Sequence, residues 1–206
     1  MSQNQCIECR QFPCSDIDTS CYQLPTLSVD PINIQMVMIT DTPRANETSM
    51  PESIEDSIEV HTTRQAFHDA GLLLPSLKAM LNLGIYITTA VKCAKKNDAV
   101  SLTTIEECSQ LLEREMAQFP NLKTIVLHGD AAIRALNAIS QRHNNKPVVP
   151  NGSTYRLRQF AYYYKQIRVF PSYQLTTPYV ATEKTRRRMI AEDIRAAYST
   201  LNRNGR

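Results

Sequence analysis

Short apolar runs that alternate with helical segments are the feature that most constrains how this chain can fold. The runs are rich in branched side chains and occupy residues 34–40, 85–91, 123–127 and 167–170. Between and after them, apolar residues recur at helical spacing over residues 65–83, 103–119, 131–140 and 183–201. Strands that alternate with helices are typical of a layered α/β fold with a central parallel sheet, whose ligands bind at the carboxyl ends of the strands.

The size and composition of the chain predict one folded domain. With 206 residues and 42% hydrophobic side chains, the chain is long and apolar enough to bury a core. We expect a single domain over residues 1–206, with a cysteine-bearing segment at 1–31 and an acidic insertion or loop at 48–63. No apolar run approaches the roughly 20 residues of a membrane span, and residues 1–10 contain no apolar signal region. These features predict a cytoplasmic protein with no membrane partner, and we expect a monomer.

The charges of the chain are distributed unevenly along it. Residues 1–60 contain ten acidic and two basic side chains, whereas residues 61–206 contain 21 basic and ten acidic ones. A basic body of this kind favours a polyanionic partner such as nucleic acid, although a solvated charged surface explains the same composition.

The cysteines of the chain predict a metal centre in more than one way. Six thiols without a secretory signal argue against disulfides, and they are Cys6, Cys9, Cys14, Cys21, Cys93 and Cys108. The first two are two residues apart, a spacing that suits zinc or an iron–sulfur cluster. They are completed either locally by Cys14 and Cys21, as a zinc knuckle, or at a distance by Cys93 and Cys108. A third interpretation leaves some of them as ordinary buried thiols.

Four short motifs follow one another over nearly the whole chain. Residues 37–44 read VMITDTPR, 86–93 read YITTAVKC, 126–132 read VLHGDAA and 170–175 read FPSYQL, while Cys108 belongs to the helix after the second motif. In this order they resemble the motifs of the uracil-DNA glycosylase superfamily, most closely its iron–sulfur branch of the family 4 type, whose second motif reads YITNxVKC. The resemblance implies a three-layer α/β/α sandwich with a central, mainly parallel four-stranded sheet.

This resemblance also implies a function in base excision repair of DNA. The reaction would be hydrolysis of the N-glycosidic bond of uracil or another deaminated base, presented as a flipped or single-stranded base. The resemblance implies that Cys6, Cys9, Cys93 and Cys108 hold a structural [4Fe–4S] cluster, with zinc as the alternative cofactor.

The resemblance also implies roles for individual residues in and between these motifs. Asp41 takes the acidic position of the first motif, where a carboxylate orients water or stabilises charge. The base-binding positions fall on Thr42, Phe67, Thr89 and Phe170. Thr89 stands where the family has a base-reading asparagine, and Phe170 where it has a histidine that donates to the base. Neither replacement can pair with uracil as the family's side chain does, so we expect weaker discrimination of uracil.

Basic, aromatic and hydroxyl side chains near the motifs are the expected DNA contacts. They are Lys95, Lys96, Ser172, Tyr173, Arg186 and Arg187. Two other functions remain open on the sequence. One is a catalytically lapsed superfamily member that binds nucleic acid or a nucleobase-like ligand, and the other is a zinc-knuckle interaction module.

Overall fold

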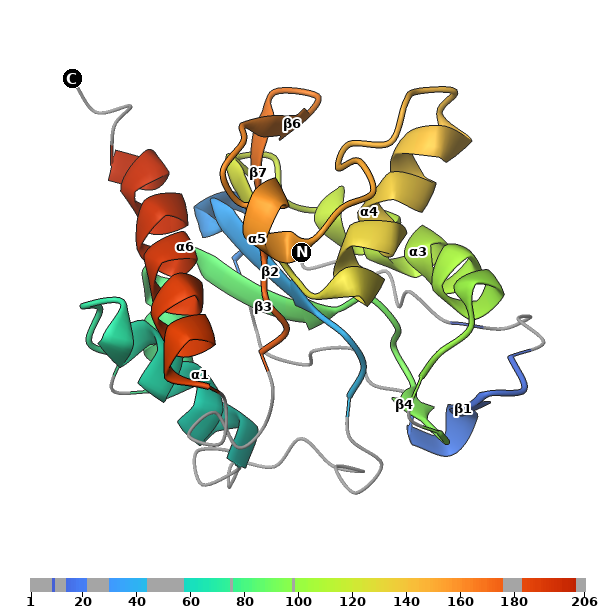
Figure 1. Cartoon of the computed structure of the whole chain (residues 1–206), viewed down its shortest axis with the longest axis horizontal. Helices are drawn as coiled ribbons and strands as arrows, with labels where there is room; N and C mark the ends of the chain where they lie inside the picture. The colour runs from blue at the N-terminus through green and yellow to red at the C-terminus, as the bar shows by residue number, and fades with distance from the viewer. Residues whose placement is uncertain are drawn as a thin grey trace.

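The computed structural model shows a central sheet between two layers of helices (Figure 1). It describes residues 9, 14–21, 30–43, 58–74, 76–97, 99–175 and 183–202. None of the helices in these residues is long and apolar enough to cross a membrane. The predicted α/β class and the three layers are confirmed.

The main sheet has five strands in the order β3-β2-β5-β7-β6. Their bounds are Met36–Thr40 for β2, Ile85–Thr89 for β3, Thr124–His128 for β5, Tyr162–Tyr164 for β6 and Ile167–Ser172 for β7. The first three and β7 are parallel to their neighbours, and β6 pairs antiparallel with β7. The predicted four-stranded sheet is therefore wrong by one strand. The tyrosine run becomes an edge strand because a tight turn, with Lys165 at φ +54°, folds it onto β7.

The helices cover both faces of this sheet. They are α1 (Ile58–Asp69), α2 (Leu77–Asn82), α3 (Leu102–Met116), α4 (Asp130–Arg142), α5 (Thr154–Leu157) and α6 (Lys184–Asn202). One buried core joins the sheet to α3 and α4, and a second joins its other face to α1 and α6. The alternation of side chains along each strand separates the cores, since Val37 and Ile39 belong to the first and Met36 and Met38 to the second.

Two predicted boundaries differ from the structure. Helix α1 starts at Ile58, so residues 58–63 of the expected acidic loop are helical, while 48–57 lie outside the described residues. The expected helix over 65–83 is divided into α1 and α2, with Gly71 at φ +77° after the end of α1. Glycine adopts this left-handed backbone at little cost, which explains why the helix stops there.

The described part of the cysteine-bearing segment docks on the body of the protein. Strand β1 (Ile17–Asp18) pairs antiparallel with β4 (Ala94–Lys95), and the short 3-10 helices η1 (Thr19–Cys21) and η2 (Pro31–Asn33) follow. The Asp16 carboxylate accepts hydrogen bonds from the Ser101 backbone N–H at 2.6 Å and from the Thr104 hydroxyl at 2.6 Å. These contacts hold residues 16–18 at the start of α3.

Candidate functional site

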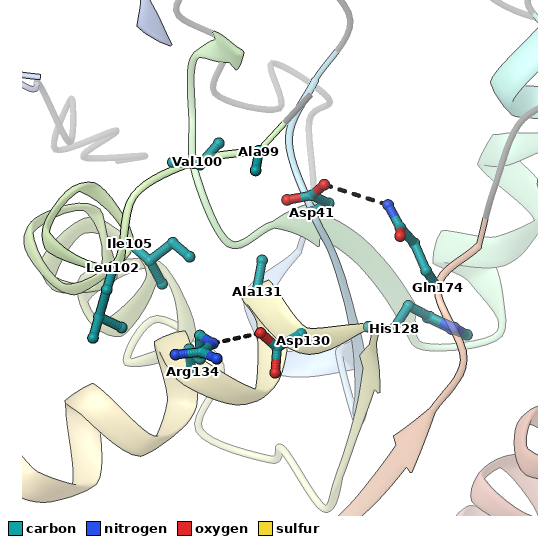
Figure 2. Close-up of a pocket in the computed structure, with 11 residues that line it drawn as sticks. Asp41, Ala99, Val100, Leu102, Ile105, His128, Asp130, Ala131, Arg134 and Gln174 are labelled. Atoms are coloured by element: carbon teal, nitrogen blue, oxygen red, sulfur yellow. Dashed lines mark hydrogen bonds and ion pairs between the residues drawn. The ribbon is translucent and has the colours of Figure 1, made fainter. Parts of the chain in front are cut away.

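A cavity of about 350 Å³ lies at the carboxyl edge of the sheet (Figure 2). Its walls come from Asp41 after β2, from Val100 and Ile105 around the start of α3, from the first turn of α4 and from Gln174 after β7. The parallel strands end at one edge, so loops that are far apart in sequence meet there. Its volume lies at the lower end of the range for small-molecule sites.

Two side chains hold one oxygen of the Asp41 carboxylate at this edge. It accepts hydrogen bonds from Lys95 Nζ at 3.2 Å and from Gln174 Nε2 at 3.3 Å. Its side chain keeps 23% of its surface exposed, so water can reach it. Figure 2 shows Asp41 and Gln174 pointing toward each other across the cavity. The predicted placement of Asp41 at a strand end is confirmed, and its fixed carboxylate is suited to orienting water or facing a developing positive charge.

The first turn of α4 forms another wall of the cavity. Gly129 precedes this helix at φ +92°, and its N–H donates to the Ser172 carbonyl at 3.1 Å. A Cβ at this position would lie 3.1 Å from Gln174 Cβ, so glycine lets the loop after β7 approach α4 closely. Asp130 and Arg134 form an ion pair on the exposed surface of the same helix.

A buried polar network anchors the end of β3 beside the site. Lys92 is fully buried, and its Nζ donates to Glu115 Oε2 at 2.6 Å, Thr88 Oγ1 at 2.6 Å and the Thr89 carbonyl at 2.7 Å. The Tyr86 hydroxyl donates to the other carboxylate oxygen of Glu115 at 2.6 Å. Burial, and next the Glu115 charge, raise the pKa of Tyr86 far above its usual range. Lys92 thereby fixes the backbone of Thr89.

Four of the cysteines belong to, or pack against, the core that joins the sheet to α3 and α4. Cys93 and Cys108 are buried, and Cys9 and Cys14 are half-buried against the same core. Burial raises the pKa of Cys93 to about 12 and that of Cys108 to about 11, and charges on Cys9 and Cys14 add to both shifts. The Lys92 backbone N–H donates to Cys108 Sγ at 3.2 Å. The sequence-predicted ligand Cys6 lies outside the described residues, as does Arg44 beside the first motif.

The predicted base-binding residues are not gathered at the cavity. Thr42 is half-buried directly after Asp41, and Thr89 is half-buried at the end of β3. Phe67 is fully buried in the core between α1 and the sheet and does not line the cavity. Phe170 turns toward α6, where the Arg168 guanidinium lies 4.5 Å from its ring centre. In this arrangement neither phenylalanine ring faces the cavity.

The predicted DNA-contact residues fall into three different environments. Lys95 is the last residue of β4 and forms an ion pair with Asp41, whereas Lys96 follows the strand and is exposed. Tyr173 is half-buried, with the Arg186 guanidinium 5.7 Å from its ring centre, and Arg187 forms an ion pair with Asp69 at 3.3 Å.

One predicted DNA contact is corrected by the structure. Ser172 is fully buried, and its hydroxyl donates to Asp193 Oδ2 at 2.8 Å. It lies on the face of β7 that packs against α6, so its side chain does not reach the surface.

Gln174 is the main site residue that sequence reasoning missed. It holds the Asp41 carboxylate and lines the cavity. It lies two residues after the end of β7, and its place just beyond a strand end was the available signal.

The buried His128 at the end of β5 predicts a pH-dependent stability. Its Nδ1 lies 3.1 Å from the Tyr173 carbonyl, which can only accept, and Nε2 has no partner among the described residues. Burial lowers the pKa of His128 from its ordinary 6.5 to about 4. The unfolded chain therefore binds the proton more tightly, and stability present above pH 6.5 is lost as the pH falls toward 4.

The expected size of this loss is about 2–3 kcal/mol between about pH 7 and about pH 4.5. Urea unfolding of wild type and of His128→Asn at both pH values measures it. The variant should lose about 2–3 kcal/mol less than wild type over this interval. Equal losses in the two proteins would show that His128 is protonated as readily in the folded state as in the unfolded one.

The comparisons with known proteins agree with this geometry. The family model of the uracil DNA glycosylase superfamily matches residues 32–195, which include Asp41, Gly129 and Gln174. No curated protein matches the chain. Since the family match covers most of the 206 residues, the chain belongs to the uracil DNA glycosylase superfamily.

Proposed function

We propose that this protein is a DNA glycosylase-type hydrolase that removes uracil or another deaminated base from DNA in base excision repair. The observation that carries the proposal is the Asp41 carboxylate, held by Lys95 and Gln174 in a cavity at the carboxyl edge of the sheet. Members of the superfamily act on DNA, which supports DNA as the partner.

In the proposed reaction, Asp41 acts on the sugar and on the attacking water. The bond between C1′ and the base nitrogen breaks, its electron pair leaves with the base, and the sugar becomes cationic. The carboxylate stabilises that charge and orients water toward C1′. Water supplies hydroxide to the sugar and a proton to the base, so the products are an abasic site and the free base.

The base would enter the cavity toward the first turn of α4. Backbone N–H groups at a helix N-terminus carry partial positive charge, which favours the negative charge that develops on the departing base. These N–H donors would matter here because Phe170 stands where the family has a histidine that donates to the base, and Phe170 turns toward α6. With a threonine at position 89, we propose a broad preference for deaminated bases.

The surface around the cavity supports binding of a flipped or single-stranded base. Lys95 and Gln174 both contact Asp41, and the Arg186 guanidinium lies 5.7 Å from the ring centre of the neighbouring Tyr173. These contacts join basic and aromatic groups along one edge of the protein. Basic groups neutralise phosphates, and the face of an aromatic ring can stack on an unpaired base.

We further propose a structural [4Fe–4S] cluster at the cysteine corner. Four thiols are the donor set that such a cluster requires, and the proposed ligands are Cys6, Cys9, Cys93 and Cys108. Of these, Cys93 and Cys108 belong to one buried core, and Cys9 packs against it. Zinc is the alternative occupant. When bound, the cluster would tie the N-terminal segment to α3 and to the end of β3, and it takes no part in the chemistry at Asp41.

A panel of damaged DNA substrates tests the proposed activity. Single- and double-stranded oligonucleotides that contain uracil, hypoxanthine or xanthine are incubated with the protein, and abasic sites are cleaved with alkali. We expect cleavage of at least one substrate, with single-stranded DNA cut faster because no base pair must open. Binding of every substrate without cleavage would identify a catalytically lapsed member, and Phe170 is the residue that favours this second candidate.

A further inference from the structure

One long stretch of the chain contains basic side chains and no acidic ones. Residues 131–182 hold seven lysines and arginines, and the carboxylates that flank this stretch are Asp130 and Glu183. Within it, residues 155–168 interleave four of these cations with five aromatic residues. The chemistry proposed at Asp41 uses none of residues 155–168, so it does not explain their pattern.

Residues 155–168 form one outer edge of the main sheet. Strand β6 is the last strand in the sheet order and pairs with residues 167–169 at the start of β7 (Figure 1). Helix α5 also contacts β7, and it lines a groove together with β6. Gln174, which lines the cavity at Asp41, lies beyond the other end of β7. The outer edge and the cavity are therefore separate places along this strand.

This edge carries an open groove and exposed aromatic rings. The groove has a volume of about 760 Å³, and its lining includes Arg156, Phe160 and Tyr162. Phe160 keeps 62% of its surface exposed, and Tyr163 on β6 keeps 59%. Exposed apolar groups that occur singly are ordinary, whereas exposed rings beside a groove are typical of a binding surface.

The Arg168 guanidinium connects the aromatic residues of this edge. It donates to the Tyr162 carbonyl at 3.0 Å and to the Phe160 carbonyl at 3.4 Å. Its central carbon also lies 5.3 Å from the ring centre of Tyr163. The backbone that carries the rings is thereby fixed before a ligand arrives, which lowers the entropy that binding costs.

Two other cations at this edge are available to a ligand. Arg156 and Lys165 are exposed, and neither forms an ion pair with any residue that the structure describes. Arg158, by contrast, is paired with Glu192 at 3.0 Å and with Asp193 at 2.8 Å. The carboxylates that α6 brings to α5 are thus already neutralised, and the charge left at the edge is positive.

We propose that this edge is a second binding surface, one for single-stranded DNA, separate from the cavity of the proposed active site. The edge surface consists of Arg156, Phe160, Tyr162, Tyr163 and Lys165. The two cations contact phosphates, and the exposed rings stack on unpaired bases. Because every base has a face that can stack, the surface holds undamaged nucleotides of the strand. The choice of DNA over other polyanions rests on the proposed function.

An oligothymidylate tests the rings without any base removal. It contains no deaminated base, so its binding does not depend on glycosylase activity. Fluorescence anisotropy measures its Kd for wild type and for the double variant Phe160→Ala, Tyr163→Thr, and circular dichroism reports folding. We expect Kd to rise about 10–100-fold in the double variant, the size that lost stacking on bases gives.

The salt dependence of Kd tests the two cations. Arg156→Gln combined with Lys165→Asn removes both charges, and asparagine tolerates the φ of +54° at position 165. The slope of log Kd against log salt should fall by about 1.4, because each phosphate contact to a single strand contributes about 0.7. The matched control is Lys78→Gln with Arg114→Gln, which removes one exposed lysine and one exposed arginine from α2 and α3 and should leave the slope unchanged.

The outcomes separate this inference from the proposed function. A wild-type Kd and salt slope in both edge variants would overturn the inference, even if the protein cleaves damaged DNA. Binding of oligothymidylate through the edge without cleavage of any damaged substrate would refute the proposed function alone. Tighter binding of oligouridylate would assign the edge to RNA. Competition by polyglutamate that does not depend on the rings would assign it to an acidic polypeptide, and either result would overturn the choice of DNA.

Discussion

Replacing Asp41 with asparagine should lower the rate of base release by about 10²–10⁴-fold, the usual contribution of a positioned acid–base group. Asparagine keeps the size of the side chain and one acceptor for Lys95 or Gln174, but it removes the negative charge. A neutral amide neither stabilises the cationic sugar nor offers a charged acceptor that orients the attacking water. Single-turnover cleavage of the best substrate from the panel, at saturating enzyme, measures this effect on the chemical step.

A second carboxylate at the same cavity provides the matched control. Asp130 also lines the cavity, but its side chain is 73% exposed and paired with Arg134 on the surface of α4. We expect Asp130→Asn to retain nearly wild-type activity, and both variants to bind substrate DNA as wild type does. Equal losses in the two variants would indicate a general effect of cavity charge, and an active Asp41→Asn would exclude the assigned role.

The strands that build the site were predictable because they are short and buried on both faces. Residues 34–40 and 85–91 contain β2 and β3, and residues 123–127 cover all of β5 except His128. The sheet register aligns the ends of these strands at one edge. That alignment is what brought Asp41 to the cavity as predicted. Strand β6 was not counted separately because Tyr162–Tyr164 has only three residues and only two residues separate it from β7. The two strands therefore form one continuous aromatic stretch in the sequence, although tyrosine itself favours strands.

The side chains that were assigned wrongly or missed depend on contacts between distant segments. Ser172 follows the same alternation as Phe170, which turns both toward α6, and Asp193 on that helix then buries the hydroxyl. Phe67 lies in the core because α1 packs against the face of the sheet that carries Met36 and Met38. Gln174 reaches Asp41 only because Gly129 leaves room beside it, and a single sequence carries no sign of that approach.

Replacing Lys92 with methionine should lower the free energy of unfolding by about 3–5 kcal/mol, as expected when one partner of a buried ion pair is removed. The Lys92 side chain is fully buried, and that of Glu115 is 5% exposed. Methionine fills a similar volume but leaves the Glu115 carboxylate buried without its counter-charge, and it removes the donor to the Thr89 carbonyl. Urea unfolding followed by circular dichroism measures the change.

A nearby lysine and a double variant show whether this loss comes from the buried charge. Lys95→Met breaks the half-exposed pair with Asp41, and such surface pairs contribute only about 0–1 kcal/mol. Lys92→Met combined with Glu115→Gln removes both buried charges and keeps an acceptor for Tyr86, so we expect it to cost about 0.5–3 kcal/mol less than the sum of the single variants. Additive losses, or a Lys92→Met variant as stable as Lys95→Met, would contradict this explanation. A coupled loss would instead mean that the ion pair between Lys92, three residues after β3, and Glu115 on α3 supports two places at once. It would hold Thr89 at the end of β3 and also the backbone that precedes Cys93, so that the base site and the cysteines beside α3 depend on the same buried pair.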